Sequence, residues 1–364
     1  MDEADFGRAF LRRAVTVERI TAALGRLRGA RLELGPYRSG PIGLAGGGAH
    51  ASLGEPTVTP RPDGSFAVSV PATVELSVRL GVETRIGARA RVDLLLTPRP
   101  AQPLLIVIDV ARVTASDVRI RPRGTGLAAP LALLAPLLDE TRGVLAAAVN
   151  RLLDSARARA ARAIDVGRRL DGVRADTPAE WIWLADDEFG AQVLARAVNH
   201  DRVARAVAGL PGQPIEIGPL PAGPRGLASV RATGSVSSAA VTAADRPGVT
   251  YDLTVALGLD LDVSAAGRHR YHAEVTLPVP ITAHPTPPLT IDVEVGPVDP
   301  ASVTVDLVAH GAGARLIARA GSLPAQLRRR VASAANKQIA AGAPRTVDLG
   351  ARIDSSGRRE PRAE

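Results

Sequence analysis

Long stretches of the chain alternate apolar with polar residues, as β-strands do when they bury one face. Residues 73–83 follow this pattern, and residues 253–263 repeat it. The alternation resumes after a turn that we place around Gly87 in the first case, and after a turn that contains Gly267 in the second. Both pairs of runs predict an antiparallel hairpin of long strands. Shorter alternating runs add further strands to both halves of the chain: 104–110, 118–120, 289–295 and 303–305.

Other segments space their apolar residues three and four positions apart, which is the pattern of an amphipathic helix. Residues 6–27 carry one such stripe and predict a single helix. Two long helices are predicted, one at 131–164 with a bend near Pro136 and one from 314 to about 341. Because many apolar residues of the 131–164 segment are alanines, this helix can approach a sheet closely.

The chain is an internal duplication with an offset of 183 residues. From 6 to 45, 18 of 40 residues are identical to their counterparts at 189–228. Two copies of one unit, each ordered helix, antiparallel strands, helix, predict an α+β fold built as a tandem repeat. We expect a first repeat at 1–167, a linker at 168–187, a second repeat at 188–350 and a disordered polar tail at 351–364.

Composition narrows the ligands and the chemistry that suit this chain. Aromatic residues make up 2% of the sequence and cysteine is absent, so the core is aliphatic and thiolate chemistry is excluded. Residues 1–183 carry 26 basic and 19 acidic side chains (+7), and residues 184–364 carry 19 and 18 (+1). The first residues lack a basic region followed by an apolar one, and the apolar run 127–138 is too short to cross a bilayer. We therefore expect a cytoplasmic protein without a transmembrane helix.

Candidate catalytic and metal sites are weak. His269 and His272 lie three residues apart on a predicted strand, so they point to opposite faces and do not readily share a metal. Asp260 and Asp262 share a face, but it is the polar face, where solvation is the simpler interpretation. The glycines at 46–48 lack the lysine and hydroxyl of a phosphate loop and predict a flexible loop. We expect no enzymatic activity, no cofactor and no metal.

Arginines gather on the closing helix of the first repeat and at the start of the linker. Near an anionic membrane surface each would contribute about 1 kcal/mol to docking, and the alternative is a solvated helix face. The arginines concerned are Arg151, Arg157, Arg159, Arg162, Arg168 and Arg169. The aromatic and amide side chains that read nucleic acid are not interleaved with them, so nucleic acid is not an expected partner. We interpret Trp181 and Trp183 as packing residues that anchor the linker.

The order of helix 6–27, strands through Ile120 and a long helix to Ile164, present twice, resembles the tubular lipid-binding (TULIP) superfamily, which includes bactericidal permeability-increasing protein. The resemblance covers residues 5–350 and is architectural. It implies a curved antiparallel sheet that wraps long helices and leaves an apolar groove for acyl chains. The groove residues that it implies here are Leu76, Val78, Leu80, Val92 and Leu94 in the first repeat, and Val255, Leu257, Leu259, Val275 and Leu277 in the second. Unlike the secreted two-repeat members, this sequence shows neither a signal peptide nor a disulfide.

The sequence thus favours non-covalent binding, and transfer, of a phospholipid, a fatty-acyl chain or another long apolar ligand. An anionic membrane surface is the expected docking partner, with the protein peripheral to it. One alternative is a structural or assembly protein whose repeats have solid cores and whose arginine-rich surfaces recruit protein partners. The nearest alternative fold is a helix-grip fold with a small-molecule cavity.

Overall fold

The structure, a computed structural model, forms two compact units that are described separately below. One, the first-repeat unit, comprises residues 7–189 and 353–364, and the other, the second-repeat unit, comprises residues 1–6 and 190–352. The structure describes residues 1–25, 28–39, 45–80, 82–123, 131–172, 176, 178–222, 228–264, 267–310, 323–342 and 345–356.

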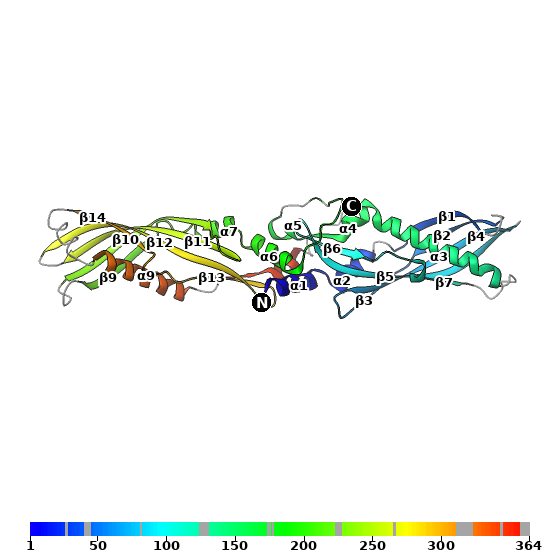
Figure 1. Cartoon of the computed structure of the whole chain (residues 1–364), viewed down its shortest axis with the longest axis horizontal. Helices are drawn as coiled ribbons and strands as arrows, with labels where there is room; N and C mark the ends of the chain where they lie inside the picture. The colour runs from blue at the N-terminus through cyan, green and yellow to red at the C-terminus, as the bar shows by residue number, and fades with distance from the viewer. Residues whose placement is uncertain are drawn as a thin grey trace. The chain divides into compact units, whose positions relative to one another are not determined.

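The first-repeat unit is built on a curled antiparallel sheet (Figure 1). Its strands are β1 (Arg31–Ser39), β2 (Ala45–Leu53), β3 (Thr57–Pro60), β4 (Phe66–Leu80), β5 (Val82–Ala101), β6 (Leu105–Val110), β7 (Val118–Pro122) and β8 (Ala163–Asp165). They pair in the order β1-β2-β4-β5-β6-β8, while β3 pairs with β4 and β7 pairs with β5. The hairpin of β4 and β5 is the centre of the sheet.

The described strands of the second-repeat unit follow the same order, without a separate counterpart of β3. Its strands are β9 (Pro214–Ala222), β10 (Ala228–Ala243), β11 (Val249–Ser264), β12 (Arg268–Thr286), β13 (Thr290–Val295), β14 (Thr304–His310) and β15 (Arg345–Asp348). They pair in the order β9-β10-β11-β12-β13-β15, with β14 on β12. Each strand therefore has a counterpart in the first repeat, and the expected α+β tandem architecture is confirmed.

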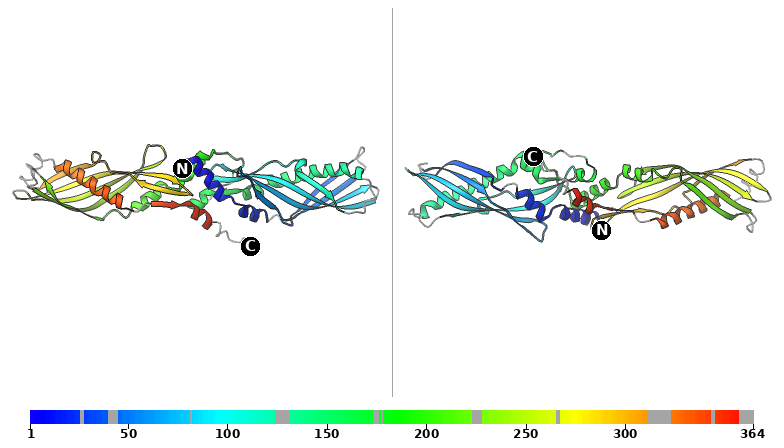
Figure 2. Two further views of the ribbon diagram at one scale, coloured as in Figure 1. Left: turned by 90° about the horizontal axis from the view of Figure 1, so that it is seen from below. Right: turned by 180° about the vertical axis from the view of Figure 1, so that it is seen from behind.

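Helices flank both sheets (Figure 2). In chain order they are α1 (Glu3–Ala14), α2 (Val17–Gly25), the 3₁₀ turn η1 (Ala115–Asp117), α3 (Leu131–Asp154), α4 (Ala156–Arg162), α5 (Val166–Asp171), α6 (Asp186–Ala197), α7 (His200–Val207), α9 (Leu323–Ala341) and α10 (Leu349–Ser356). The longest helix of each repeat, α3 or α9, lies along its sheet. Within the described ranges, no helix is both long and apolar enough to cross a membrane.

The single helix expected at 6–27 is wrong, because the segment is two helices that break at residues 15–16. The hydroxyl oxygen of Thr16 accepts from the backbone N–H of Arg19 (3.4 Å), which starts a new helix. The Arg19 guanidinium donates to the carbonyl oxygen of Ala14 (2.8 Å), one of the acceptors left open at the end of α1. The apolar stripe continues across the break, so spacing alone did not reveal it.

The second repeat breaks its opening helix in the same way. Asn199 accepts from the backbone N–H of Arg202 (3.0 Å), and the Arg202 guanidinium donates to the carbonyl oxygen of Ala197 (2.7 Å). Because Thr16 and Asn199 occupy matching positions in the duplication, as do the two arginines, the break is a repeated feature of the fold.

Two expected loops are strands. The hairpin turn placed at Gly87 is wrong: β4 ends at Leu80 and β5 begins at Val82, while Gly87 lies inside β5 opposite Glu75. The glycines at 46–48 belong to β2 and pair with β1 and β4, so the predicted loop there is also wrong. In both places the alternation of faces continues through glycine, which has no side chain to mark a face.

The closing segments also differ from expectation. The helix expected at 131–164 ends at Asp154, and the hydroxyl of Ser155 caps α4 by accepting from the backbone N–H of Ala158 (3.3 Å). Residues 163–165 then form β8, which pairs with β6. The second long helix is described from Leu323, and its expected start at 314 lies outside the described residues. The disordered tail is wrong for residues 351–356, which are helical.

The end of α10 is tied into the first-repeat unit. Ile353 is buried. Asp354 forms ion pairs with Arg13 and Arg19, the latter at 3.7 Å. The Arg19 guanidinium also donates to the carbonyl oxygen of Ile353 (3.3 Å). The same arginine that caps α1 thus holds a segment more than three hundred residues away in sequence.

One glycine is required by close approach of two strands. A Cβ atom added at Gly234 in β10 would overlap the carbonyl oxygen of Gly258 in β11 and come within 2.9 Å of its carbonyl carbon. The obstacle is backbone, so it cannot rotate away.

We expect Gly234→Ala to destabilise the second-repeat unit by about 2 kcal/mol or more, measured by chemical denaturation. The matched control is Gly258→Ala on the adjacent strand, where an added Cβ would meet only the Cε1 of His272 at 3.8 Å. That control should change stability by less than about 0.5 kcal/mol. Equal effects of the two substitutions would contradict this account.

A histidine links α7 to β10 in the second-repeat unit. The Nε2 of His200 lies 3.0 Å from the carbonyl oxygen of Val241, and its Nδ1 lies 3.4 Å from Oδ1 of Asp201. The hydrogen bond to Val241, followed by the interaction with Asp201, raises the pKa of His200 above its ordinary value of 6.5. A raised folded-state pKa means that protonation favours the folded state.

The stabilisation from His200 should therefore be complete below the unfolded-state pKa and disappear as pH rises through the raised folded-state pKa. Thermal melts of the wild type and of His200→Gln at about pH 5.5 and about pH 8.5 check this. We expect the wild type to be the more stable protein at the lower pH, with the difference shrinking at the higher pH. A difference that does not depend on pH would refute the assignment.

Candidate ligand-binding site

The inner face of the second-repeat sheet is a continuous aliphatic surface made by β11 and β12. In the register of the two strands, Val255 lies opposite Leu277, Leu257 opposite Val275, and Leu259 opposite Ala273. The five residues expected to line a groove here thus fall in three adjacent cross-strand rows. All are buried except Val255, which is half-buried. Burial alternates along both strands, so this face points inward over its whole length.

The expected groove residues of the first repeat are more dispersed. Leu76 lies opposite Ile86, and both are buried. Val92, also buried, lies opposite Val70, and Leu94 is half-buried. The side chains of the other two expected residues, Val78 and Leu80, lie outside the described part of the structure.

Sequence reasoning missed the middle of this surface in the first repeat. Between Leu76 and Val92 the inner face is completed by three buried residues of β5 and two of β4: Ile86, Ala88, Ala90, Val74 and Ala72. Placing the hairpin turn at Gly87 removed Ile86, Ala88 and Ala90 from the predicted face, whereas Val74 lay on the predicted strand 73–83. The alternation of Ile86, Ala88 and Ala90 was the available signal.

Each long helix is seated on the edges of its sheet. Helix α3 contacts β1, at one end of the strand order, and β7, an edge strand beyond β5. Helix α9 makes the equivalent contacts with β9 and β14. The helix therefore bridges the two margins of a curled sheet, and the space between helix and sheet is bounded by both. The helix side of this space is apolar, with Leu145 and Val149 buried on α3 and Leu327 and Val331 buried on α9.

An asparagine fastens each long helix to the chain that leaves the sheet. The Asn150 side chain donates to the carbonyl oxygen of Val113 (2.8 Å) and accepts from its backbone N–H (3.0 Å). Asn336 makes the same pair of bonds with Val298, at 3.1 and 2.7 Å. Each bracket fixes a helix against an edge of its sheet. Neither was anticipated, although the recurrence of asparagine in both long helices was visible in the sequence.

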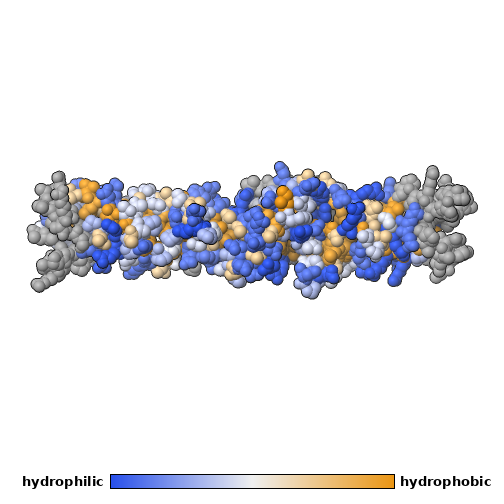
Figure 3. Space-filling model, viewed as in Figure 1, coloured by the Kyte–Doolittle hydropathy of each residue, from blue (hydrophilic) through white to orange (hydrophobic). Residues whose placement is uncertain are grey.

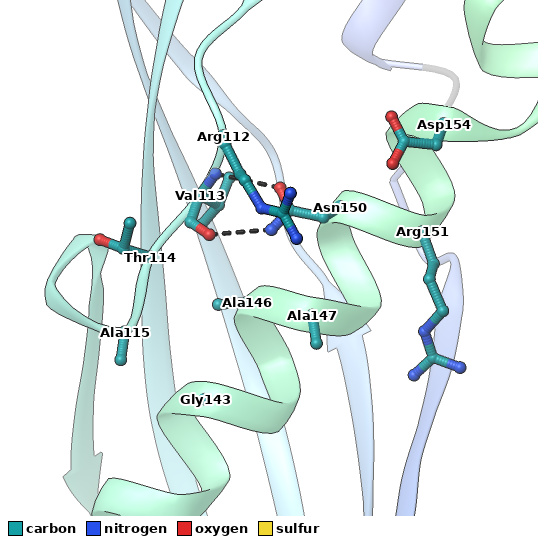
Figure 4. A pocket seen from close by; sticks show the side chains of 10 residues that line it. All are labelled: Arg112, Val113, Thr114, Ala115, Gly143, Ala146, Ala147, Asn150, Arg151 and Asp154. Carbon is teal, nitrogen blue, oxygen red and sulfur yellow. Dashed lines mark hydrogen bonds between the residues drawn. The ribbon is translucent and has the colours of Figure 1, made fainter.

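Beside the first bracket lies a shallow hollow of about 370 Å³ (Figure 4). It is lined by the loop after β6 and by the second half of α3: Arg112, Val113, Thr114, Ala115, Gly143, Ala146, Ala147, Asn150, Arg151 and Asp154. It lies at the seam between the long helix and the sheet edge.

The arginines expected to dock on a membrane divide into two groups. Arg159 donates to the carbonyl oxygens of Pro178 and Ala179, and its guanidinium lies 5.5 Å from the ring centroid of Trp181. Arg162 donates to the carbonyl oxygen of Leu153 (3.1 Å). Burial lowers the pKa of Arg162, while nearby Asp109 and Asp154 act in the opposite direction. These two arginines therefore serve the internal packing of the unit.

The other four arginines expected to dock on a membrane differ in their exposure. Arg151, Arg157 and Arg168 are exposed, and Arg169 is half-buried. On the face shown in Figure 3, hydrophilic and hydrophobic residues are interspersed. Membrane docking by the exposed arginines remains a prediction.

The tryptophans lie where the linker meets the first-repeat sheet. Trp183 forms a β-bridge with Ala101, and the backbone N–H of Leu184 donates to the carbonyl oxygen of Pro100 (3.0 Å). The Arg99 guanidinium lies 4.1 Å from the centroid of the Trp183 ring. Both tryptophans pack against the buried cluster around Leu105. Their interpretation as linker anchors agrees with this geometry.

The polar residues weighed for catalysis are solvated. Asp260 lies 2.9 Å from Nδ1 of His272 and its side chain is 81% exposed. Asp262 is paired with Arg270 at 3.5 Å, again on the outer face. Among the described residues, no three His, Asp or Glu side chains gather as a metal site would require.

Comparisons with known proteins complete this description. No protein-family model and no curated protein matches the chain. Among solved structures, lipopolysaccharide binding protein is similar over 92% of this chain and 90% of its own, at 12% identity and a TM-score of 0.30. P47 of Clostridium botulinum E1 is similar over 91% and 87% of the two chains, at 7% identity and a TM-score of 0.26. P47 from Clostridium botulinum A2 is similar over 89% and 84%, at 8% identity and a TM-score of 0.24.

Proposed function

We propose that each unit binds a lipid or another long apolar molecule between its long helix and the inner face of its sheet, without covalent chemistry. The observation that carries the proposal is the seating of α3 and α9 on edge strands, opposite an inner face that is aliphatic in consecutive rows. A helix held at the margins leaves the central strands to be covered by side chains or by a ligand.

The chemistry of this interior suits acyl chains. Each methylene group buried there contributes about 0.8 kcal/mol, so a long chain is held by many small and equivalent contacts. Aliphatic walls provide few hydrogen-bonding groups that would distinguish one chain from another. We therefore expect broad specificity for the apolar part of the ligand.

The same proposal covers how ligand is exchanged and where in the cell the protein acts. The exposed arginines of the first-repeat unit would hold a cytoplasmic protein against an anionic membrane while ligand passes in or out. The competing function is that of an assembly protein with solid cores, and it predicts that no ligand is bound.

We expect protein purified without detergent to carry lipid, detected by native mass spectrometry as a mass excess that organic solvent extracts. Protein that is consistently free of ligand, and takes up no added fatty acid, would exclude the proposal in favour of solid cores.

The substitution Leu257→Arg tests whether the ligand binds at the inner face of the sheet. This substitution puts a cation on the inner face and should abolish uptake of a fluorescent fatty acid by the second-repeat unit, leaving its circular dichroism intact if the interior is open to ligand. The matched control is Ala256→Arg, one residue away on the opposite face of β11. Cooperative unfolding caused by Leu257→Arg but not by Ala256→Arg would indicate a solid core.

A further inference from the structure

The hollow beside α3 in the first-repeat unit has the construction of a small polar binding site. Its floor on the helix is formed by Gly143, Ala146 and Ala147, whose small side chains leave the space open. Its rim on the loop side is held in place, because both polar atoms of the Asn150 amide are engaged by the backbone of Val113.

Two arginines flank this hollow without internal partners. Within the described part of the chain, neither Arg112 nor Arg151 forms a hydrogen bond or ion pair, and both are exposed. In Figure 4, Arg112 extends from the loop toward α3, and Arg151 projects from the helix. Other arginines of the unit, such as Arg159 and Arg162, are held by carbonyl oxygens, whereas these two are not.

The single carboxylate of the lining does not neutralise this pair. Asp154 interacts electrostatically with Arg162, which is half-buried nearby. The lining therefore contains two guanidinium groups and one carboxylate, and that carboxylate already interacts with Arg162. Guanidinium groups bind phosphate oxygens through paired, charge-assisted hydrogen bonds.

The corresponding position in the second repeat has different chemistry. Aligning the two asparagine brackets places Pro297 where the first repeat has Arg112, and Asp299 where it has Thr114. Lys337 replaces Arg151. Ala340 stands where the first repeat has Asp154, so Asp299 leaves the number of carboxylates unchanged. The loss of one cation lowers the local charge by one, which disfavours an anion. The sequence excess of positive charge in residues 1–183 is consistent with this asymmetry.

We infer that the hollow binds a phosphate ester, and that it selects lipids with an anionic phosphate headgroup for the first-repeat unit. This rests on the proposed function, because the acyl chains are to be held in the adjacent interior. The same chemistry would accept a soluble phosphate ester, so both sources are tested.

The test uses the whole chain and the double variant Arg112→Gln/Arg151→Gln. Phosphatidylglycerol and phosphatidylcholine with identical acyl chains compete for the protein, and native mass spectrometry reports the occupancy of each. We expect the double variant to lower the ratio of phosphatidylglycerol to phosphatidylcholine about tenfold, through loss of charge-assisted bonds. Total lipid occupancy should be retained.

The control is Arg89→Gln/Arg121→Gln, which removes the same charge from two exposed arginines paired across β5 and β7 in the same unit. It should leave the lipid ratio within about twofold of the wild type. An equal loss of preference in both double variants would overturn the inference, because net charge would then explain it.

A titration with glycerol phosphate distinguishes a lipid headgroup from a soluble phosphate ester. Binding is detected as shifts in the methyl NMR signals of Ala146 and Ala147. Shifts lost in Arg112→Gln/Arg151→Gln, together with the change in lipid ratio, support a headgroup site. Shifts in a protein that takes up neither lipid would contradict the proposed function and assign the hollow to a soluble phosphate ester. No shifts and no change in lipid ratio would refute the anion site while leaving lipid binding standing.

Discussion

The two-residue period of the long hairpins is the constraint on which both units depend. In β11 and β12, every second residue points inward, and the register places aliphatic residues opposite one another from Leu253 to Leu259. An antiparallel pair of this length twists and curls, because each strand has a right-handed twist. The apolar side of the curl must be covered, and the long helix covers it from the sheet margins. The arrangement of helix and sheet is thus a consequence of one buried face.

Polar side chains then fix the helices against this surface in a repeated manner. Asn150 and Asn336 bracket the chain leaving the sheet, while Arg19 and Arg202 close the break in each opening helix. Such groups stabilise the fold because each satisfies backbone atoms that have no partner within their own element. Their recurrence shows that the duplication preserved the joints as well as the strands. Arg112 and Arg151 lie outside this internal network, and for that reason they are available to a ligand.

Sequence reasoning recovered the elements whose evidence is local and periodic. The tandem repeat, the long strands and the curved α+β unit follow from apolar spacing and from residue matches, and the structure contains them. Sequence reasoning failed at a glycine and at helix caps, because the periodic spacing of apolar residues continues through these positions. Gly87 was read as a turn although Ile86 and Ala88 continue the inward face. Thr16 and Asn199 start new helices inside an unbroken apolar stripe.

By itself, the sequence determined that the chain folds as two copies of an aliphatic, largely non-aromatic unit with a strongly basic first half, because composition and period are properties of the chain alone. Only the tertiary structure decided which arginines are free to act. Arg159 and Arg162 lie within the same cluster as Arg151 and Arg157, yet they are held by carbonyl oxygens of neighbouring segments. The tertiary structure also decided that the helices sit on edge strands, since strand order depends on pairing between residues far apart in sequence. Contacts of that kind leave no periodic signal, so they could be found only in the folded molecule.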